Sequence, residues 1–197
     1  MFWFEPPDQH ISWEYSVDNF LDNNDINLID EYVNAHQSQL KKAEINSPEN
    51  GLDYQYRRSD IMWITDTQAM SVIYNKITRF ILEVNSTHFK YSLNYIEPFQ
   101  YSVYDSSNQG YYDIHCDSTL RNTSGWTRKI SFSILLNDSS DFKDGDLALH
   151  ITKNPVPLKQ QKGTIVLFPS FLPHSVSPVT EGIRKSLVGW AGGPNLV

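Results

Sequence analysis

The stretch that decides the fold is Gly110-Tyr111-Tyr112-Asp113-Ile114-His115-Cys116-Asp117, residues 110–117. In an extended chain, side chains two positions apart project to the same face. His115 and Asp117 can therefore bind one metal ion while Cys116 points away. The triplet predicts two ligands of a metal site whose third ligand must come from another part of the chain.

His174 is the expected third ligand. It follows residues 164–168, a short apolar run between a glycine and a proline that is typical of a buried strand. Two histidines and one carboxylate, with coordination positions left open, are the ligand set of non-haem Fe(II) oxygenases. His150, in the apolar segment 147–151, is the alternative third ligand. An isolated histidine in an apolar strand is more often a hydrogen-bonded structural residue, so His174 is preferred.

Arg184 follows on what reads as the next strand, residues 184–190. Period-two spacing puts Arg184, Ser186 and Trp190 on one face of that strand. A guanidinium group suits a carboxylate, and a nearby hydroxyl can add a further donor. With a metal on one side and Arg184 on the other, the site suits a dicarboxylate whose far end pairs with the arginine.

In these motifs the chain resembles the Fe(II)- and 2-oxoglutarate-dependent dioxygenases of the prolyl 4-hydroxylase-like group. The similar positions make up about the last half of the chain: Tyr104 and residues 110–117, 128–137, 155–174 and 179–190. Two departures stand out. Many members carry Gly-Gly-x-Leu where this chain has Asp144-Gly145-Asp146-Leu147, and collagen-type enzymes carry lysine where it has Arg184.

The resemblance implies that His115, Asp117 and His174 bind Fe(II). It further implies that Arg184 binds the distal carboxylate of 2-oxoglutarate, with Tyr104 as a second contact. Ascorbate is a candidate accessory reductant. The implied enzyme couples oxidative decarboxylation of 2-oxoglutarate by O2 to hydroxylation of a C–H bond. The leading substrate is a prolyl residue in a peptide or protein, and the alternative is a free amino acid or another small molecule.

Two other classes of protein could use the same residues. A zinc hydrolase could activate water with the three ligands, although it would not require Arg184. A metal-free binding module with a jelly-roll fold would turn them into a polar pocket. Two polar loops, residues 46–53 and 118–126, could fold over an extended substrate chain. Trp126 in the second loop is a candidate substrate contact.

The order of apolar patterns predicts an α+β fold, a double-stranded β-helix (jelly roll) with N-terminal supporting helices, within one domain spanning residues 1–197. Residues 1–85 are expected to be mainly helical support, and residues 99–190 the jelly-roll core.

The first predicted helix starts at Asn24 and Asp25 and ends at Lys41-Lys42. The second starts at a capping box of Thr65 and Gln68, and its buried face is Ile73, Ile77, Phe80, Ile81 and Val84.

Strands are expected at residues 99–104, 130–136, 147–151, 164–168 and 185–190. In the second of these, Ser131 and Ser133 share one face while larger apolar residues share the other. That serine-bearing face could line a polar cavity.

Composition excludes several classes of partner. The chain has 16 basic and 23 acidic residues, a net charge of −7, and no basic run, which disfavours nucleic acid. No apolar run approaches the roughly 20 residues of a membrane span, and Met1–Pro7 lacks the features of a signal peptide. One cysteine excludes an internal disulfide and fits a reducing compartment, so a cytoplasmic location is expected.

Overall fold

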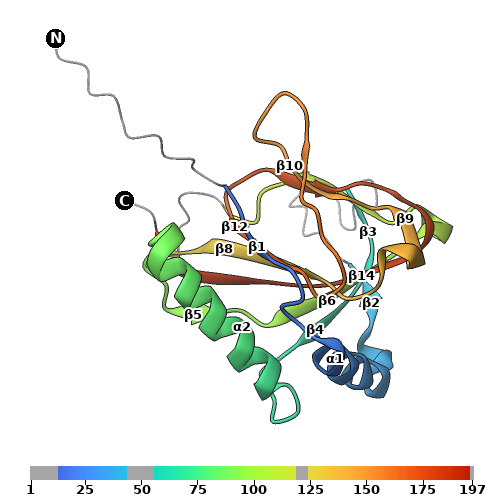
Figure 1. Cartoon of the computed structure of the whole chain (residues 1–197), viewed down its shortest axis with the longest axis horizontal. Helices are drawn as coiled ribbons and strands as arrows, with labels where there is room; N and C mark the ends of the chain where they lie inside the picture. The colour runs from blue at the N-terminus through green and yellow to red at the C-terminus, as the bar shows by residue number, and fades with distance from the viewer. Residues whose placement is uncertain (1–12, 44–55, 119–123, 196–197) are drawn as a thin grey trace.

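The computed structural model describes residues 13–43, 56–118 and 124–195, which form two antiparallel sheets and two principal helices (Figure 1). The large sheet has the order β1 (Tyr15–Val17), β12 (Ile165–Pro169), β8 (Trp126–Leu135), β14 (Val179–Pro194), β6 (Phe99–Asp105), β4 (Asp60–Ile64) and β2 (Lys41–Lys42), and β5 (Tyr95–Ile96) and β9 (Phe142–Asp144) also pair with β14. The smaller sheet has the order β11 (Val156–Pro157), β10 (Leu147–Leu149), β13 (His174–Val176), β7 (Tyr111–His115) and β3 (Arg57–Arg58).

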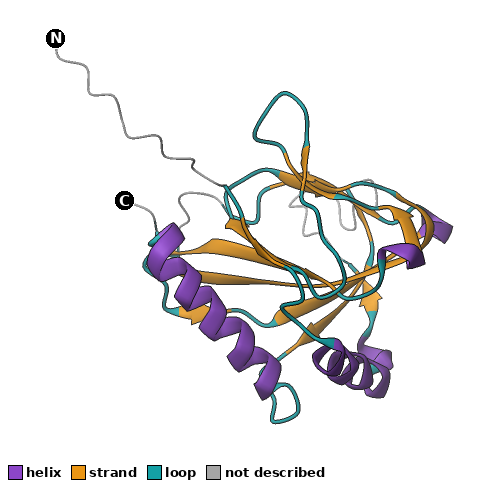
Figure 2. Ribbon diagram, in the orientation of Figure 1, coloured by secondary structure: helices purple, strands orange, loops and turns teal. Residues whose placement is uncertain are grey.

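The three layers of the molecule are the smaller sheet, the large sheet and the helices. In Figure 2 the long strands of the large sheet lie between the smaller sheet above and the helices α1 (Asn23–Ala35) and α2 (Ser71–Val84) below. Short helical turns also lie at Gln37–Gln39, Asn85–Phe89, Ser106–Asn108 and Ser139–Asp141. The predicted jelly roll with supporting helices on one face is therefore confirmed.

The main apolar core lies between the helices and the large sheet. Its buried members include Ile29 of α1, Ile77 of α2, Phe132 of β8 and Leu187 of β14. A second cluster, which includes Leu149, Phe168 and Val176, fills one part of the space between the two sheets. The rest of that space is a cavity lined by both polar and apolar residues.

Strand β8 separates the core from the cavity by simple alternation. Ile130 and Ile134 are buried in the helix-side core, whereas Ser131 and Ser133 line the cavity between the sheets; Phe132 belongs to the core and also borders the cavity. Successive residues of a strand face opposite sides of the sheet, so one strand serves both regions. The predicted serine-bearing cavity wall is confirmed.

The first helix differs from its predicted bounds at both ends. Asp22 is the N-cap, and its Oδ1 accepts hydrogen bonds from the backbone N–H groups of Asn24, at 2.8 Å, and Asp25, at 2.9 Å. The helix ends at Ala35, and the prediction that it runs to Lys41-Lys42 is wrong. These two lysines pair with β4 as strand β2, because sheet hydrogen bonding overrides a weak local helix propensity.

The second helix has the predicted buried face, but the predicted capping box is wrong. Ile73, Ile77, Ile81 and Val84 are buried, and Phe80 packs against the same core. The N-cap is Met70, which makes no side-chain capping bond. Residues 67–70 form a turn closed by the backbone bond from Met70 N–H to the Thr67 carbonyl, so the helix begins beyond the proposed box.

The N-terminal part of the chain also supplies four strands that the sequence did not reveal. β4 is the most consequential, because it pairs with β6 and extends the large sheet. Its Met62 and Ile64 enter the helix-side core, while Ile61 and Trp63 line the cavity. Within the described segments, no helix is long and apolar enough to cross a membrane.

Candidate metal centre

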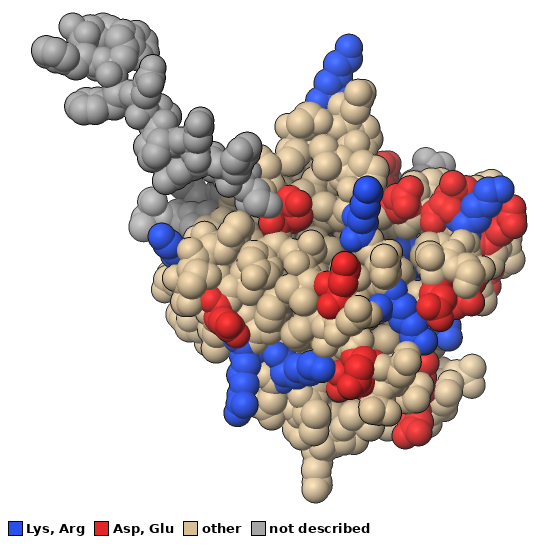
Figure 3. All heavy atoms as spheres, viewed as in Figure 1, with Lys and Arg blue, Asp and Glu red and all other residues tan. Residues whose placement is uncertain are grey.

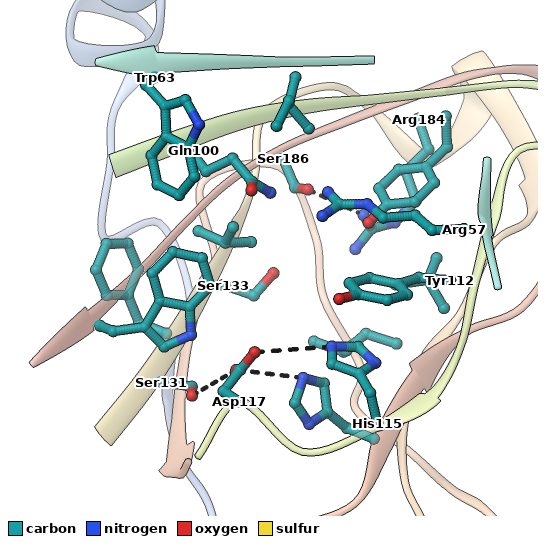
Figure 4. A pocket seen from close by; sticks show the side chains of 18 of the residues that line it. Arg57, Trp63, Gln100, Tyr112, His115, Asp117, Ser131, Ser133, Arg184 and Ser186 are labelled. Atoms are coloured by element: carbon teal, nitrogen blue, oxygen red, sulfur yellow. Dashed lines mark hydrogen bonds and ion pairs between the residues drawn. The ribbon is translucent and has the colours of Figure 1, made fainter. Parts of the chain in front are cut away.

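Strand pairing in the smaller sheet brings the two predicted histidine ligands together. His115 ends β7, His174 begins β13, and the antiparallel register places them opposite each other. Asp117 lies in the bend that follows β7, with Oδ1 3.7 Å from His115 Nε2 and Oδ2 3.4 Å from His174 Nε2. One ligand atom from each residue lies within 4.8 Å of the others (Figure 4). Cys116 is exposed and is not among the residues that line this cluster's cavity, in agreement with the prediction.

Backbone carbonyls determine which nitrogen of each histidine faces the cluster. His115 Nδ1 lies 2.8 Å from the Asp113 carbonyl oxygen, and His174 Nδ1 lies 2.9 Å from that of Leu172. A carbonyl can only accept, so each Nδ1 carries the hydrogen. Each Nε2 is then the nitrogen turned towards Asp117, which is the arrangement of metal-binding histidines held by their second nitrogen.

The carboxylate of Asp117 is oriented from the large sheet. Ser131 Oγ donates to Asp117 Oδ2 at 2.7 Å and lies 2.9 Å from Ser170 Oγ. Burial alone would raise the pKa of Asp117, but His174, His115 and the Ser131 hydrogen bond outweigh it and hold that pKa well below its ordinary value. Asp117 is therefore an anion at neutral pH.

The two histidines differ in protonation. Burial, aided by the charge of His174, lowers the pKa of His115 to about 4, so this ring is neutral and can act as a ligand. Burial also lowers the pKa of His174, but the hydrogen bond and charge of Asp117 outweigh it and raise that pKa. A metal ion between them would take the place of the His174 proton. The donor set therefore fits a divalent transition metal.

Aromatic rings hold the histidine rings in place. Tyr112 stacks on His115 with ring centroids 3.6 Å apart, and Phe168 lies edge-on to His174 at 4.8 Å. Rings packed in this way lose little freedom when a metal binds.

Arg184 lies deep in the cavity that the metal cluster faces. The cavity has a volume of about 690 Å³ and is lined by both sheets; its walls include Tyr104, Ser186 and the three predicted ligands. Arg184 is only 3% exposed; Nη1 donates to Ser186 Oγ and Nη2 to Gln160 Oε1, each at 3.2 Å. Its guanidinium carbon lies 5.6 Å from the Tyr104 ring centroid.

The charge of Arg184 has no carboxylate partner among the ion pairs of the described residues. Burial lowers its pKa, opposed by Tyr104 and Asp146. A buried guanidinium bonded only to neutral oxygens is well suited to an incoming carboxylate. The sequence had singled out Tyr104, Arg184 and Ser186, and the fold brings all three to one cavity.

Asp144 and Gly145, which stand where many family members carry two glycines, both have positive φ. Asp144 has φ 60° and Gly145 has φ 75°, both in the left-handed region, which aspartate tolerates better than most residues. Thr180 Oγ1 bonds the Asp144 carboxylate. A Cβ atom at Gly145 would lie 2.7 Å from Val179 Cγ2 and 3.2 Å from Arg184 Cδ, so glycine is kept where the loop packs on Arg184.

Two other candidates lie outside this constellation. His150 Nε2 is 2.8 Å from Ser175 Oγ, and the residue is not part of the metal cluster, so the structural interpretation of His150 is confirmed. Trp126 is 49% exposed and borders a separate hollow beside Cys116, so its contact with substrate stays a prediction. The predicted loop 46–53 lies outside the described residues, as do residues 119–123 of the second loop.

Several cavity residues could not be found from the sequence. Arg57, Trp63 and Gln100 line the cavity from β3, β4 and β6, and Gln160 reaches Arg184 from an irregular segment. Trp190 also lines the cavity, where the Arg128 guanidinium lies 3.8 Å from its ring centroid. Of the strands that carry these residues, only β6 was predicted from the sequence, and its pattern did not distinguish a face towards the cavity from a face towards solvent.

Comparisons with known proteins agree with this geometry. A model of the 2OG-Fe(II) oxygenase superfamily matches residues 99–192. A PKHD-type hydroxylase of Idiomarina loihiensis is 36% identical over 80 residues, 41% of this chain and 36% of that protein. A PKHD-type hydroxylase of Synechococcus is 32% identical over 91 residues, 46% of this chain and 40% of that protein. The chain thus matches about two fifths of the length of these relatives.

Solved structures extend the likeness to the whole described fold. A Pseudomonas putida prolyl-4-hydroxylase superposes with a TM-score of 0.71 at 19% identity over 91% of each chain. A prolyl hydroxylase of Trichoplax adhaerens, solved with a peptide fragment of hypoxia inducible factor, gives 0.74 at 21% identity over 91% of this chain and 83% of that one. Residues 99–192, which include the metal cluster, therefore match the 2OG-Fe(II) oxygenase superfamily, and the chain has the prolyl 4-hydroxylase-like fold.

Proposed function

We propose that this protein is an Fe(II)- and 2-oxoglutarate-dependent dioxygenase that hydroxylates a C–H bond of its substrate. The observation that carries the proposal is the pairing of two groups in one cavity. Two histidine Nε2 atoms and one carboxylate converge within 4.8 Å of one another, and a buried arginine without a carboxylate partner among the described ion pairs lines the same cavity. The first group suits Fe(II), and the second suits the distal carboxylate of 2-oxoglutarate.

His115, Asp117 and His174 would hold the iron. When bound, iron and 2-oxoglutarate supply with O2 the oxidising power for hydroxylation, with loss of CO2 from 2-oxoglutarate and formation of succinate. The residues of the chain supply position and charge. The carbonyls behind each Nδ1 fix the histidine rings, and Ser131 fixes the Asp117 carboxylate.

Arg184 and Ser186 would hold the co-substrate from the other side. Both are almost fully buried, so the pairing of guanidinium and carboxylate takes place away from bulk water, where it is strongest. Tyr104, also buried, adds a hydroxyl in the same wall. With the metal and 2-oxoglutarate bound in this way, the substrate would occupy the rest of the cavity.

The leading substrate is a prolyl residue in a peptide or protein. Support comes from the PKHD-type hydroxylase relatives and from the fold shared with prolyl hydroxylases, one of them solved with a peptide. A free amino acid or another small molecule is the alternative substrate. A reducing, cytoplasmic location and one domain over residues 1–197 complete the proposal, the former supported by the single cysteine.

A zinc hydrolase and a metal-free binding module are the competing functions, and one experiment separates all three. The purified chain is stripped of metal, reloaded with Fe(II) or Zn²⁺, and supplied with O2 and 2-oxoglutarate. Succinate formation that requires Fe(II) supports the dioxygenase, with ascorbate expected to prolong turnover. Tight zinc binding without any succinate would favour the hydrolase, and no metal uptake would favour the binding module.

A further inference from the structure

A second buried arginine, Arg57, lines the cavity without a role in the metal or 2-oxoglutarate site. It lies on β3 and is 7% exposed. Nε donates to Ser59 Oγ at 2.7 Å, and the guanidinium carbon lies 4.4 Å above the Tyr112 ring centroid. Nη2 is buried and has no hydrogen-bond partner among the described residues. Since buried donors are nearly always paired, the open Nη2 indicates a missing ligand.

The position of Arg57 separates it from Arg184. Arg57 comes from the edge strand of the smaller sheet, whereas Arg184 comes from β14, which lies between β8 and β6 in the large sheet. Ser59 is the single residue between β3 and β4. Strand β2, which pairs with β4, is an edge strand of the large sheet. Figure 4 shows Arg57 reaching over Tyr112 into the cavity. Arg57 therefore projects from the edge of the sandwich, and Arg184 from its middle.

The charges lining the cavity are strongly unbalanced. Its basic residues are Lys41, Lys42, Arg57, Arg128 and Arg184. Asp117 is the one carboxylate among the described lining residues. Arg128 is paired with Glu97 through bonds of 2.7 and 2.6 Å.

In the proposed function Asp117 serves the metal and Arg184 serves 2-oxoglutarate. Arg57 then leaves a buried positive charge in the cavity that neither the metal nor 2-oxoglutarate uses. The chain as a whole carries −7, and Figure 3 shows basic and acidic side chains interspersed on one face of the surface. The positive lining is therefore a local property of the cavity.

Resting on the proposed function, we propose that Arg57 recognises a carboxylate of the substrate, so that the hydroxylated carbon lies close to an acidic group. The ligand is a carboxylate because a neutral carbonyl would satisfy Nη2 without compensating the buried charge. The guanidinium fork binds carboxylates through two parallel bonds. Stacking over Tyr112 fixes the plane of that fork. The source is an aspartate or glutamate side chain beside the target residue, or the free carboxylate of a small amino acid.

Paired probes test this with the full chain, loaded with an inert divalent metal and 2-oxoglutarate. One arm uses capped single-proline peptides with glutamate at each position from two before to two after the proline, each with a glutamine twin. The other arm uses L-proline against prolinamide. Calorimetry should give at least one carboxylate probe about tenfold to hundredfold tighter binding than its twin, the worth of a charge-assisted bond. The arm that shows this preference identifies the carboxylate source.

Variants assign the preference to Arg57. Arg57→Gln should abolish the difference between twins, and Arg57→Lys should restore part of it. Arg58→Gln is the matched control, because Arg58 bonds the Asn108 carbonyl, lies beside Tyr111 and is not among the cavity-lining residues. Affinity for 2-oxoglutarate, measured in the same titrations, should move less than about threefold in Arg57→Gln. Matching thermal melts show that the variants are folded.

Several results would overturn the assignment. Equal binding of both members of every pair, or no binding of any probe, would show that the protein does not recognise a substrate carboxylate. A preference that survives in Arg57→Gln assigns it to other residues. A tenfold loss of 2-oxoglutarate affinity moves Arg57 to the co-substrate site. Failure of the proposed function is seen separately, as no succinate from the iron-loaded wild-type chain, since the preference is measured by binding.

Discussion

The two parts of the chain that build the cavity differ in how they reach it. The C-terminal strands β7, β13 and β14 carry His115, His174 and Arg184, and Asp117 lies in the bend two residues beyond His115. The N-terminal strands β2, β3 and β4 contribute lysines, Arg57 and Trp63 only because the chain returns to the sheet edges. In the proposed function the first part holds the metal and 2-oxoglutarate. In the proposal for Arg57 the second part recognises the substrate.

Loss of a metal ligand should have the largest effect. His174→Ala should abolish Fe(II) binding and 2-oxoglutarate turnover while the fold persists, because the other two ligands cannot hold the ion alone. Metal content and succinate formation are the measurements. His150→Ala is the matched control, since His150 bonds Ser175 and lies outside the cluster. Full turnover in His174→Ala would transfer the third ligand to another residue.

Removal of Arg184 should have the next largest effect and should act on a different quantity. Arg184→Ala should raise the 2-oxoglutarate requirement about tenfold to hundredfold, because a charge-assisted bond is worth roughly 1.5–3 kcal/mol. Arg184→Lys should recover part of that loss by keeping the charge without the fork.

Titrating iron and 2-oxoglutarate separately distinguishes this role from a structural one. Iron affinity should change much less than the 2-oxoglutarate requirement. Lys185→Ala is the control, because neighbouring residues of a strand face opposite sides. An unchanged 2-oxoglutarate requirement in Arg184→Ala would remove the arginine from the co-substrate site.

Ser131 tests whether the large sheet tunes the metal site of the smaller one. Ser131→Ala removes the 2.7 Å bond to Asp117 and should weaken metal binding about tenfold, the lower range for partners of metal ligands. Ser133→Ala, two residues along the same face of β8, should weaken it much less. Equal losses in the two variants would mean that metal affinity depends on the polar face of β8 as a whole and not on the Ser131–Asp117 hydrogen bond.

The C-terminal site could be predicted from the sequence because its residues obey local rules. His115 and Asp117 are two apart, Arg184 and Ser186 are two apart, and Ser131 and Ser133 mark the polar face of a strand. Arg57 obeys no such rule. It reaches the cavity only through pairing with Tyr112, far along the chain, and its neighbours gave no strand pattern.

Errors in the N-terminal part have the same physical origin. Local propensity places Lys41-Lys42 at the end of a helix. In the fold the two lysines pair with β4 as a strand, because sheet pairing overrides that weak local preference. Gln160 lies in an irregular segment, and its bond to Arg184 depends on the whole fold. Contacts that depend on pairing between strands far apart in the chain leave no periodic pattern in the sequence. The substrate side of the cavity could therefore be found only from the structure.

The smallest expected effect comes from substitutions in the helices, which should change the stability of the fold and leave the site intact. Ile77→Val removes one methylene from the fully buried face of α2, which should cost about 1 kcal/mol and lower the melting temperature by about 2–4 °C. Ile29→Val in α1 is the matched variant, since it is equally buried in the same core. Iron affinity and the 2-oxoglutarate requirement should stay within about twofold of wild type, because the large sheet stands between the helices and the cavity. Calorimetric melts and the same two titrations measure both quantities. If either valine variant weakened 2-oxoglutarate binding as much as Arg184→Ala, helix packing would be shaping the cavity directly, and the N-terminal helices would belong to the site instead of its support.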